Sequence, residues 1–181
     1  MTYYGGKELA AAFRTVRNNT IKIAEDIPED KYGFRPAEGT RTVAELLSHV
    51  AHGVRFHQEV TLQGRNNLDG FNYMQFMSGL MAETKKPRTK AELVDLLKAE
   101  GAAFATQLEG LSDEFLGQVI TFPPGGDPPA RSRFDMLMSV KEHEMHHRGQ
   151  LMLIQRILGQ TPHLTRENEA RRAALMARKQ C

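Results

Sequence analysis

A helical pattern over the residues from about Arg133 to Leu158 constrains the fold more than any other part of the chain. Apolar residues recur there at the 3.6-residue spacing of an α-helix and fall within about 40° of one line along it. These residues are Met136, Val140, Ile154 and Leu158. Because His143 and His147 fall on the same line, one helical turn apart, the pattern predicts a long helix that directs two imidazoles toward the core.

Two imidazoles on a buried face need polar partners, because a buried polar group without one costs about 1–3 kcal/mol. A single buried histidine is most often hydrogen-bonded to a core carbonyl group. Two histidines at positions i and i+4 favour a metal site instead, since histidine is the commonest metal ligand. His146 lies about 80° from the apolar line, so we expect it to be a flanking group and not a ligand.

Helical periodicity also dominates the rest of the chain, and no alternating strand pattern is convincing. We expect a first helix from about Lys7 to Ile27, followed by a connecting segment over Pro28 to Thr40. Two Thr-x-x-Glu capping boxes then open helices. These helices are predicted to run from Thr42 to about Gly64 and from Thr89 to about Leu111.

The remaining segments are shorter. The stretch from Phe71 to Met81 predicts a short helix or an irregular excursion, and the prolines and glycines of Phe122 to Pro129 predict a loop. The helix with the two histidines should end at Gly159, and the basic tail from Arg166 to Lys179 should form a solvated amphipathic helix. The pattern predicts an all-α four-helix bundle with a short additional helix and a C-terminal helical tail.

The composition limits the functions that the chain can have. Its 181 residues, 1–181, fit a single domain, and 24 basic against 22 acidic side chains do not indicate a nucleic-acid partner. The single cysteine, Cys181, allows no intramolecular disulfide and no cysteine-based metal site. Since the sequence shows no leader and no apolar run of roughly 20 residues, we expect a cytoplasmic protein without a membrane partner.

A catalytic metal site usually has three protein ligands and an open position, so a third ligand is needed. The expected second helix offers His49, His52 and His57. His57 lies about 40° from the apolar line of that helix, His49 about 120°, and His52 lies opposite it. The angular count therefore favours His57, although an inner helix of a bundle can contact partners on two sides.

Two blocks of the sequence resemble the DinB-like family of metal-binding four-helix bundles. They read Arg-Pro-Ala-Glu-Gly-Thr-Arg-Thr-Val-Ala-Glu-Leu-Leu-Ser-His over residues 35–49 and His-Glu-Met-His-His-Arg-Gly-Gln-Leu over residues 143–151. Matched residue by residue, the resemblance implies that the metal ligands are His49, His143 and His147. The sequence departs from the family pattern at Arg41, where an aromatic residue is common, and in the loop from Phe122.

The segment from His143 to His147 also satisfies the zinc-protease motif His-Glu-x-x-His, in which Glu144 would serve as general base and Glu169 would mimic a third ligand. That motif needs a strand-rich region before its helix, whereas this chain predicts helices. We therefore expect Glu144 on the helix surface or bordering the metal cavity. Gln150, about 40° from the apolar line, should face inward and hydrogen-bond within the site.

Three neutral imidazoles with an open position would lower the pKa of a bound water or thiol to near neutrality. The resemblance implies a metal-dependent enzyme that activates a low-molecular-weight thiol, such as mycothiol or bacillithiol, or water. We expect one divalent transition metal, zinc or nickel, a small-molecule substrate and a homodimer. The alternative is a non-catalytic, stress-associated metal-binding protein, which a fourth histidine ligand, His57 or His146, would favour.

Overall fold

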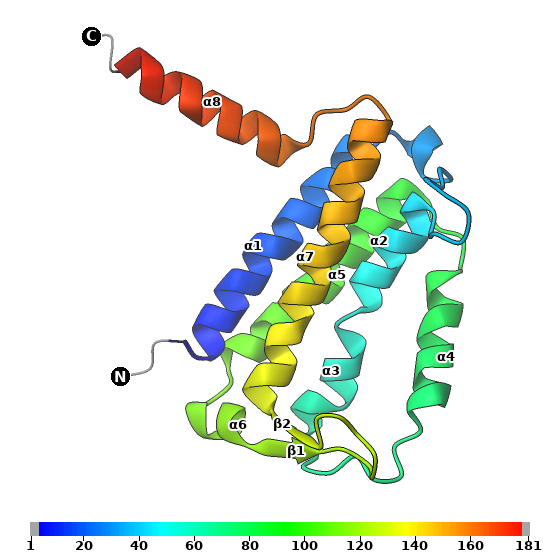
Figure 1. Cartoon of the computed structure of the whole chain (residues 1–181), viewed down its shortest axis with the longest axis vertical. Helices are drawn as coiled ribbons and strands as arrows, with labels where there is room; N and C mark the ends of the chain where they lie inside the picture. Colours follow the sequence, from blue (N-terminus) through cyan, green and yellow to red (C-terminus); the bar gives the residue numbers. More distant parts are fainter. Residues whose placement is uncertain (1–3, 179–181) are drawn as a thin grey trace.

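The computed structural model describes residues 4–178, and it is an all-α four-helix bundle, as predicted (Figure 1). The bundle helices are α1 (Gly6–Asp26), α2 (Val43–His52), α5 (Lys90–Glu109) and α7 (Arg133–Ile157). The smaller helical elements are η1 (Glu29–Lys31), α3 (Arg55–Glu59), η2 (Thr61–Gln63), α4 (Tyr73–Thr84), α6 (Asp113–Gly117) and α8 (His163–Arg178). Helix α1 packs on α5 and α7, and α2 packs on α5, α7 and α4.

Local capping fixes where the bundle helices begin. The Thr42 hydroxyl accepts a hydrogen bond from the Glu45 amide at 3.1 Å, and the Glu45 carboxylate accepts one from the Thr42 amide at 2.8 Å. Thr89 and Glu92 form the same capping box at the start of α5, and the Ser132 hydroxyl caps α7. Both predicted capping boxes are therefore confirmed, and the one at Thr42 sets the position of α2.

The prediction that the second helix continues to Gly64 is wrong. Helix α2 ends at His52, the chain turns at Gly53 and Val54, and two short elements, α3 and η2, follow (Figure 1). Glycine is a poor helix former and β-branched residues are weaker than most, so this stretch lacks the propensity to continue the helix. An angular count that runs straight through Gly53 therefore misplaces the residues beyond it.

Two short strands flank the predicted proline-rich loop, although no strand was expected. Strand β1 (Val119–Thr121) pairs antiparallel with β2 (Ala130–Ser132), with Val119 opposite Ser132. Three residues are too few to show an alternating pattern. The buried Arg133 side chain anchors this end of the bundle, since it donates to the Gln118 side chain at 3.1 Å and to the Arg65 carbonyl at 2.7 Å.

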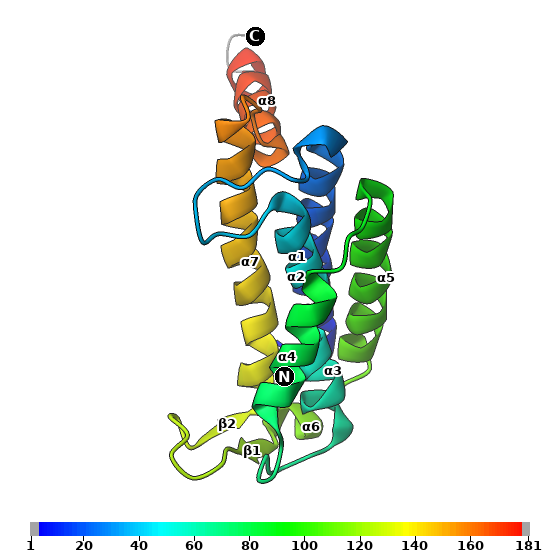
Figure 2. The ribbon, with the colours of Figure 1, turned by 90° about the vertical axis from the view of Figure 1, so that its right-hand side faces the viewer.

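The two outer helices lie on different sides of the bundle. Helix α4 confirms the short helix predicted near Phe71 to Met81 and lies alongside α2, outside the four main helices (Figures 1 and 2). Helix α8 confirms the helical tail and extends away from the bundle (Figure 1), whereas Lys179 lies outside the described residues. No helix in the described part of the chain is long and apolar enough to cross a membrane.

The core lies between α1, α2, α5 and α7. It is filled mainly by leucine, isoleucine, valine and phenylalanine side chains, with Phe13 and Phe104 packed edge to face at 5.0 Å between ring centroids. Helix α2 is buried on nearly all sides, including Leu47, Ser48 and His52. Because α2 has partners on several sides, it can direct a polar side chain inward from a face other than its apolar line.

Candidate metal centre

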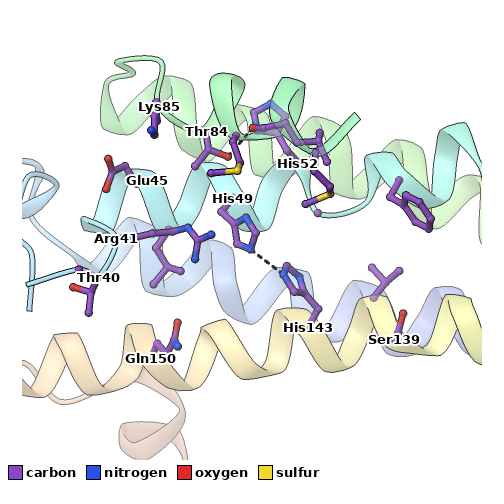
Figure 3. A pocket seen from close by; sticks show the side chains of 18 of the residues that line it. Thr40, Arg41, Glu45, His49, His52, Thr84, Lys85, Ser139, His143 and Gln150 are labelled. Atoms are coloured by element: carbon purple, nitrogen blue, oxygen red, sulfur yellow. Dashed lines mark hydrogen bonds between the residues drawn. The ribbon is translucent and has the colours of Figure 1, made fainter. Parts of the chain in front are cut away.

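Three histidine side chains from two helices meet inside the bundle. The Nε2 atom of His49, on α2, lies 2.9 Å from Nε2 of His143 and 3.1 Å from Nε2 of His147, both on α7. The Nε2 atoms of His143 and His147 are 3.2 Å apart. Figure 3 shows His49 and His143 facing each other across the space between the two helices. The structure thus brings together the three residues that the family resemblance selects.

The spacing of the three nitrogens fits a single metal ion. A circle through them has a radius of about 1.8 Å, and a zinc–imidazole bond is about 2.0–2.1 Å, so one point can lie at bonding distance from all three. Among the described residues, no further histidine, cysteine, aspartate or glutamate joins the cluster. The arrangement would therefore leave coordination positions open for another ligand.

Gln150 orients the His147 ring. Its side-chain oxygen lies 2.8 Å from Nδ1 of His147. Since an amide oxygen can only accept, Nδ1 carries the proton, and the free electron pair of the neutral ring is on Nε2, which faces the other two histidines. The expectation that Gln150 hydrogen-bonds within the site is confirmed by this contact.

The surroundings keep the three imidazoles neutral. The pKa of His49 falls from 6.5 to about 3, chiefly because burial disfavours the charged ring and next because the Arg41 guanidinium is nearby. Burial likewise lowers the pKa of His143 to about 4. Burial also lowers the pKa of His147, although the hydrogen bond to Gln150 opposes the shift. Neutral imidazole is the form that binds metals, so the cluster is ready for a metal ion at neutral pH.

The other three histidines considered as ligands lie apart from the cluster. His57, favoured by the angular count, is buried on α3, and its Nδ1 lies 3.1 Å from the Thr61 hydroxyl. His52 is buried as well, with Nδ1 2.8 Å from the Ser48 carbonyl oxygen. His146 is exposed beside Gln150, in agreement with the flanking position expected for it.

Glu144 lies in the core and not on the helix surface, which corrects the expectation for this residue. Its carboxylate accepts hydrogen bonds from Nε of Arg17 at 2.9 and 3.1 Å, and both side chains are almost completely buried. Arg17 also donates to the carbonyl groups of Leu97 and Val50. Glu144 is therefore engaged in an ion pair. It is not placed to act as a general base, which is the role that the protease interpretation requires of it.

Arg17 is the residue that the sequence analysis missed. It follows the buried Phe13 by four residues on α1, so a charged side chain on an apolar helix face was the available signal. Arg17 can occupy this position because residue 101 of α5 is a glycine. An added Cβ atom at Gly101 would lie 2.7 Å from Cγ of Arg17. Contacts between four helices cannot be read from the periodicity of one helix.

The cluster borders a large cavity of about 1430 Å³. His49 and His143 line it, together with side chains from the segment before α2, from α4 and from the β-hairpin region. Much of the lining is apolar or aromatic, including Phe56, Tyr73 and Met77. A small molecule could thus reach two of the three histidines from the cavity.

Fold and cluster together define a helical-bundle protein with a three-histidine site suited to a metal ion. The chain belongs to the DinB superfamily, whose family model matches residues 12–151. The resemblance seen in the two sequence blocks is therefore confirmed.

Similar proteins come from Bacillus subtilis. The uncharacterized protein YjoA of strain 168 is 27% identical over 154 residues, which cover 85% of this chain and 91% of YjoA. The crystal structure of YjoA, described as DinB-like, aligns with a TM-score of 0.63 at 25% identity, over 85% of this chain and 94% of that one. YfiT, described as a probable metal-dependent hydrolase with an unusual four-helix-bundle topology, aligns with a TM-score of 0.65 at 15% identity, over 89% of this chain and 91% of YfiT.

Proposed function

We propose that this protein is a metal-dependent enzyme in which His49, His143 and His147 hold one divalent transition metal, zinc or nickel. The observation that carries the proposal is the convergence of three neutral imidazole nitrogens at the wall of a large cavity. Structural zinc sites normally have four protein ligands, whereas catalytic sites keep a position open. Three ligands beside a cavity therefore favour catalysis over a purely structural role.

A divalent metal at this position would lower the pKa of a coordinated water or thiol toward neutrality. The protein contributes the conditions for that chemistry. Burial holds His49 and His143 neutral, Gln150 fixes the tautomer of His147, and the cavity gives a small-molecule substrate access to the centre. Nitrogen ligands suit several late transition metals, so direct analysis must identify the one that binds.

The proposed reaction is either hydrolysis or transfer of a group to a low-molecular-weight thiol. The description of YfiT as a probable metal-dependent hydrolase supports the first. The resemblance to DinB-like transferases that use mycothiol or bacillithiol supports the second. Glu144 has no part in either reaction, because it is paired with Arg17 in the core.

Cobalt-substituted protein distinguishes the two reactions. If a thiol is the nucleophile, adding bacillithiol or mycothiol should produce a sulfur-to-metal charge-transfer band, since thiolates are good ligands for late divalent metals. The band should be absent in the His147→Ala variant. A hydrolase would instead cleave small esters or amides in a metal-dependent manner without any added thiol. Metal binding with neither response would contradict the enzyme proposal and favour a non-catalytic metal-binding protein.

A further inference from the structure

The charged residues that line the cavity are mostly basic. Four cationic side chains and one carboxylate contribute to its wall, namely Arg35, Arg41, Lys85, Arg131 and Glu45. The carboxylate is already engaged, because Glu45 accepts from the Thr42 amide at 2.8 Å and from Arg35 at 3.2 Å. Arg131 is neutralised by Asp135 at 2.7 Å. The cavity therefore keeps an excess of positive charge, to which a bound metal ion would add.

Arg41 is a cation of the cavity wall whose charge acts on the histidine cluster. It is exposed, and no carboxylate in residues 4–178 pairs with it. Figure 3 shows its side chain extending along α2 toward the His49 ring. Its charge reaches the whole cluster, since it contributes to lowering the pKa of His49, His143 and His147. The backbone beside it is held by the capping box at Thr42.

Helix α4 supplies an apolar wall to the same cavity. Tyr73, Met77, Leu80 and Met81 line it from this helix. Tyr73 and Met81 are about half exposed, at 52% and 55%. Apolar side chains left open to solvent inside a concave site mark a surface for an apolar ligand group.

We propose that Arg41 is an anion-binding residue and that the cavity binds an amphipathic organic anion, with its carboxylate or phosphate group at Arg41 and its apolar part against α4. A guanidinium group offers paired donors that match either anion. The proposal rests on the proposed function in taking this cavity as the substrate site. It places the charged end of the substrate next to the metal centre.

Binding of three compounds with the same alkyl chain, octanoate, octyl phosphate and 1-octanol, tests the proposal. Isothermal titration calorimetry on the metal-free protein removes direct metal–ligand bonds from the comparison. At least one anion should bind about tenfold or more tightly than the alcohol, because a hydrogen bond to a charged group is stronger than one to a neutral group. The anion that shows the preference identifies the headgroup.

Two substitutions make the test specific. Arg41→Met should reduce the preference for the anion to near unity while leaving 1-octanol binding unchanged, and Arg41→Lys should retain part of the preference. Arg35→Met is the matched control, since Arg35 lines the same cavity but is paired with Glu45; this variant should keep the wild-type preference. Circular dichroism checks that each variant is folded.

Three results would overturn the proposal. They are equal binding of anions and alcohol, a preference that survives Arg41→Met, and no binding of any compound up to millimolar concentration. The metal proposal is judged separately, by metal analysis. An Arg41-dependent preference in a protein that binds no metal would support the anion site and contradict the metal centre. Metal binding without an Arg41-dependent preference would support the metal centre and contradict the anion site.

Discussion

Burial of individual histidine rings decides what the cluster can bind. The pKa of His49 is about 3 and that of His143 about 4, both well below the ordinary value of 6.5. In the folded protein, protons therefore do not compete with a metal ion at these rings near neutral pH. The same shifts make the metal-free protein sensitive to acid.

We predict that the metal-free protein loses stability as the pH falls from 7.5 to 5.5. Below about pH 6.5, histidines of the unfolded chain take up protons that folded His49 and His143 do not bind until about pH 4. The contribution of these two histidines to the free energy of unfolding is therefore fully present above the pKa that they have in the unfolded chain. Below that pKa the contribution decreases. Urea denaturation at the two pH values measures the decrease. A His49→Gln/His143→Gln variant should lose less over the same interval, and an equal loss would contradict the account.

Gly53 makes room for the His143 ring, because glycine has no side chain. A Cβ atom at this position would lie 3.1 Å from Cε1 and 3.2 Å from Nδ1 of the His143 ring. The Gly53 backbone is in the right-handed helical region, so alanine is conformationally allowed there. The added methyl group would then press on the His143 ring and, at 3.3 Å, on the Val50 carbonyl oxygen.

We predict that Gly53→Ala lowers metal affinity by about tenfold, because changes next to metal ligands that shift their orientation commonly have effects of this size. Competition with a chromophoric chelator measures the affinity. Gly149→Ala on α7 is the control, since a methyl group there meets no other described residue within 4 Å. Equal affinities in the two variants would show that His143 adapts freely.

At the scale of elements, one buried ion pair joins the four main helices. Arg17 of α1 binds Glu144 of α7 and donates to the carbonyl groups of Leu97 on α5 and Val50 on α2. Glu144 directly follows His143 on α7. The pair therefore fixes the rotation of α7 that directs its two histidines toward α2.

We predict that Glu144→Gln destabilises the protein by about 3–5 kcal/mol, since it leaves the Arg17 charge buried without its partner. Denaturant unfolding measures the loss. Metal content should remain stoichiometric in the folded variant, because Glu144 is not a ligand. An Arg17→Met/Glu144→Met double variant should be more stable than Glu144→Gln. A Glu144→Gln variant of wild-type stability would contradict this role of the pair.

The elements were predictable where their signals are local. The capping boxes at Thr42 and Thr89 located two helix starts, and the i, i+4 spacing of His143 and His147 indicated their shared direction. His49 came only from family resemblance, because α2 is buried on several sides and breaks at Gly53, so a count along one apolar line favours His57. The partner of Glu144 lies on α1, 127 residues earlier in the chain, and no local pattern contains that contact.

At the scale of the whole molecule, apolar side chains remain exposed on α7 and α8. Leu153, Ile157, Leu175 and Met176 are each more than half exposed. We predict a homodimer, since two-fold assemblies are the commonest oligomers and a self-association surface would cover such residues. Analytical ultracentrifugation tests this prediction. A monomer as the only species at micromolar concentration would contradict it.

The proposed metal centre would join α2 and α7, the two helices that carry the three histidines. A metal ion that binds only the folded state would stabilise the whole molecule, by about 2.7 kcal/mol when its free concentration is 100 times the dissociation constant. Stability and the proposed chemistry would thus depend on the same three residues. The central claim is that these residues bind a metal.

Metal content of the purified protein, measured by elemental analysis after loading with zinc or nickel and removal of excess metal, tests this claim most directly. We predict one metal ion per wild-type chain and loss of that ion in each of the variants His49→Ala, His143→Ala and His147→Ala. His52→Ala, on the same helix as His49 but outside the cluster, should keep it. Wild-type metal content in the folded His49→Ala variant, or none in the wild-type protein, would contradict the account.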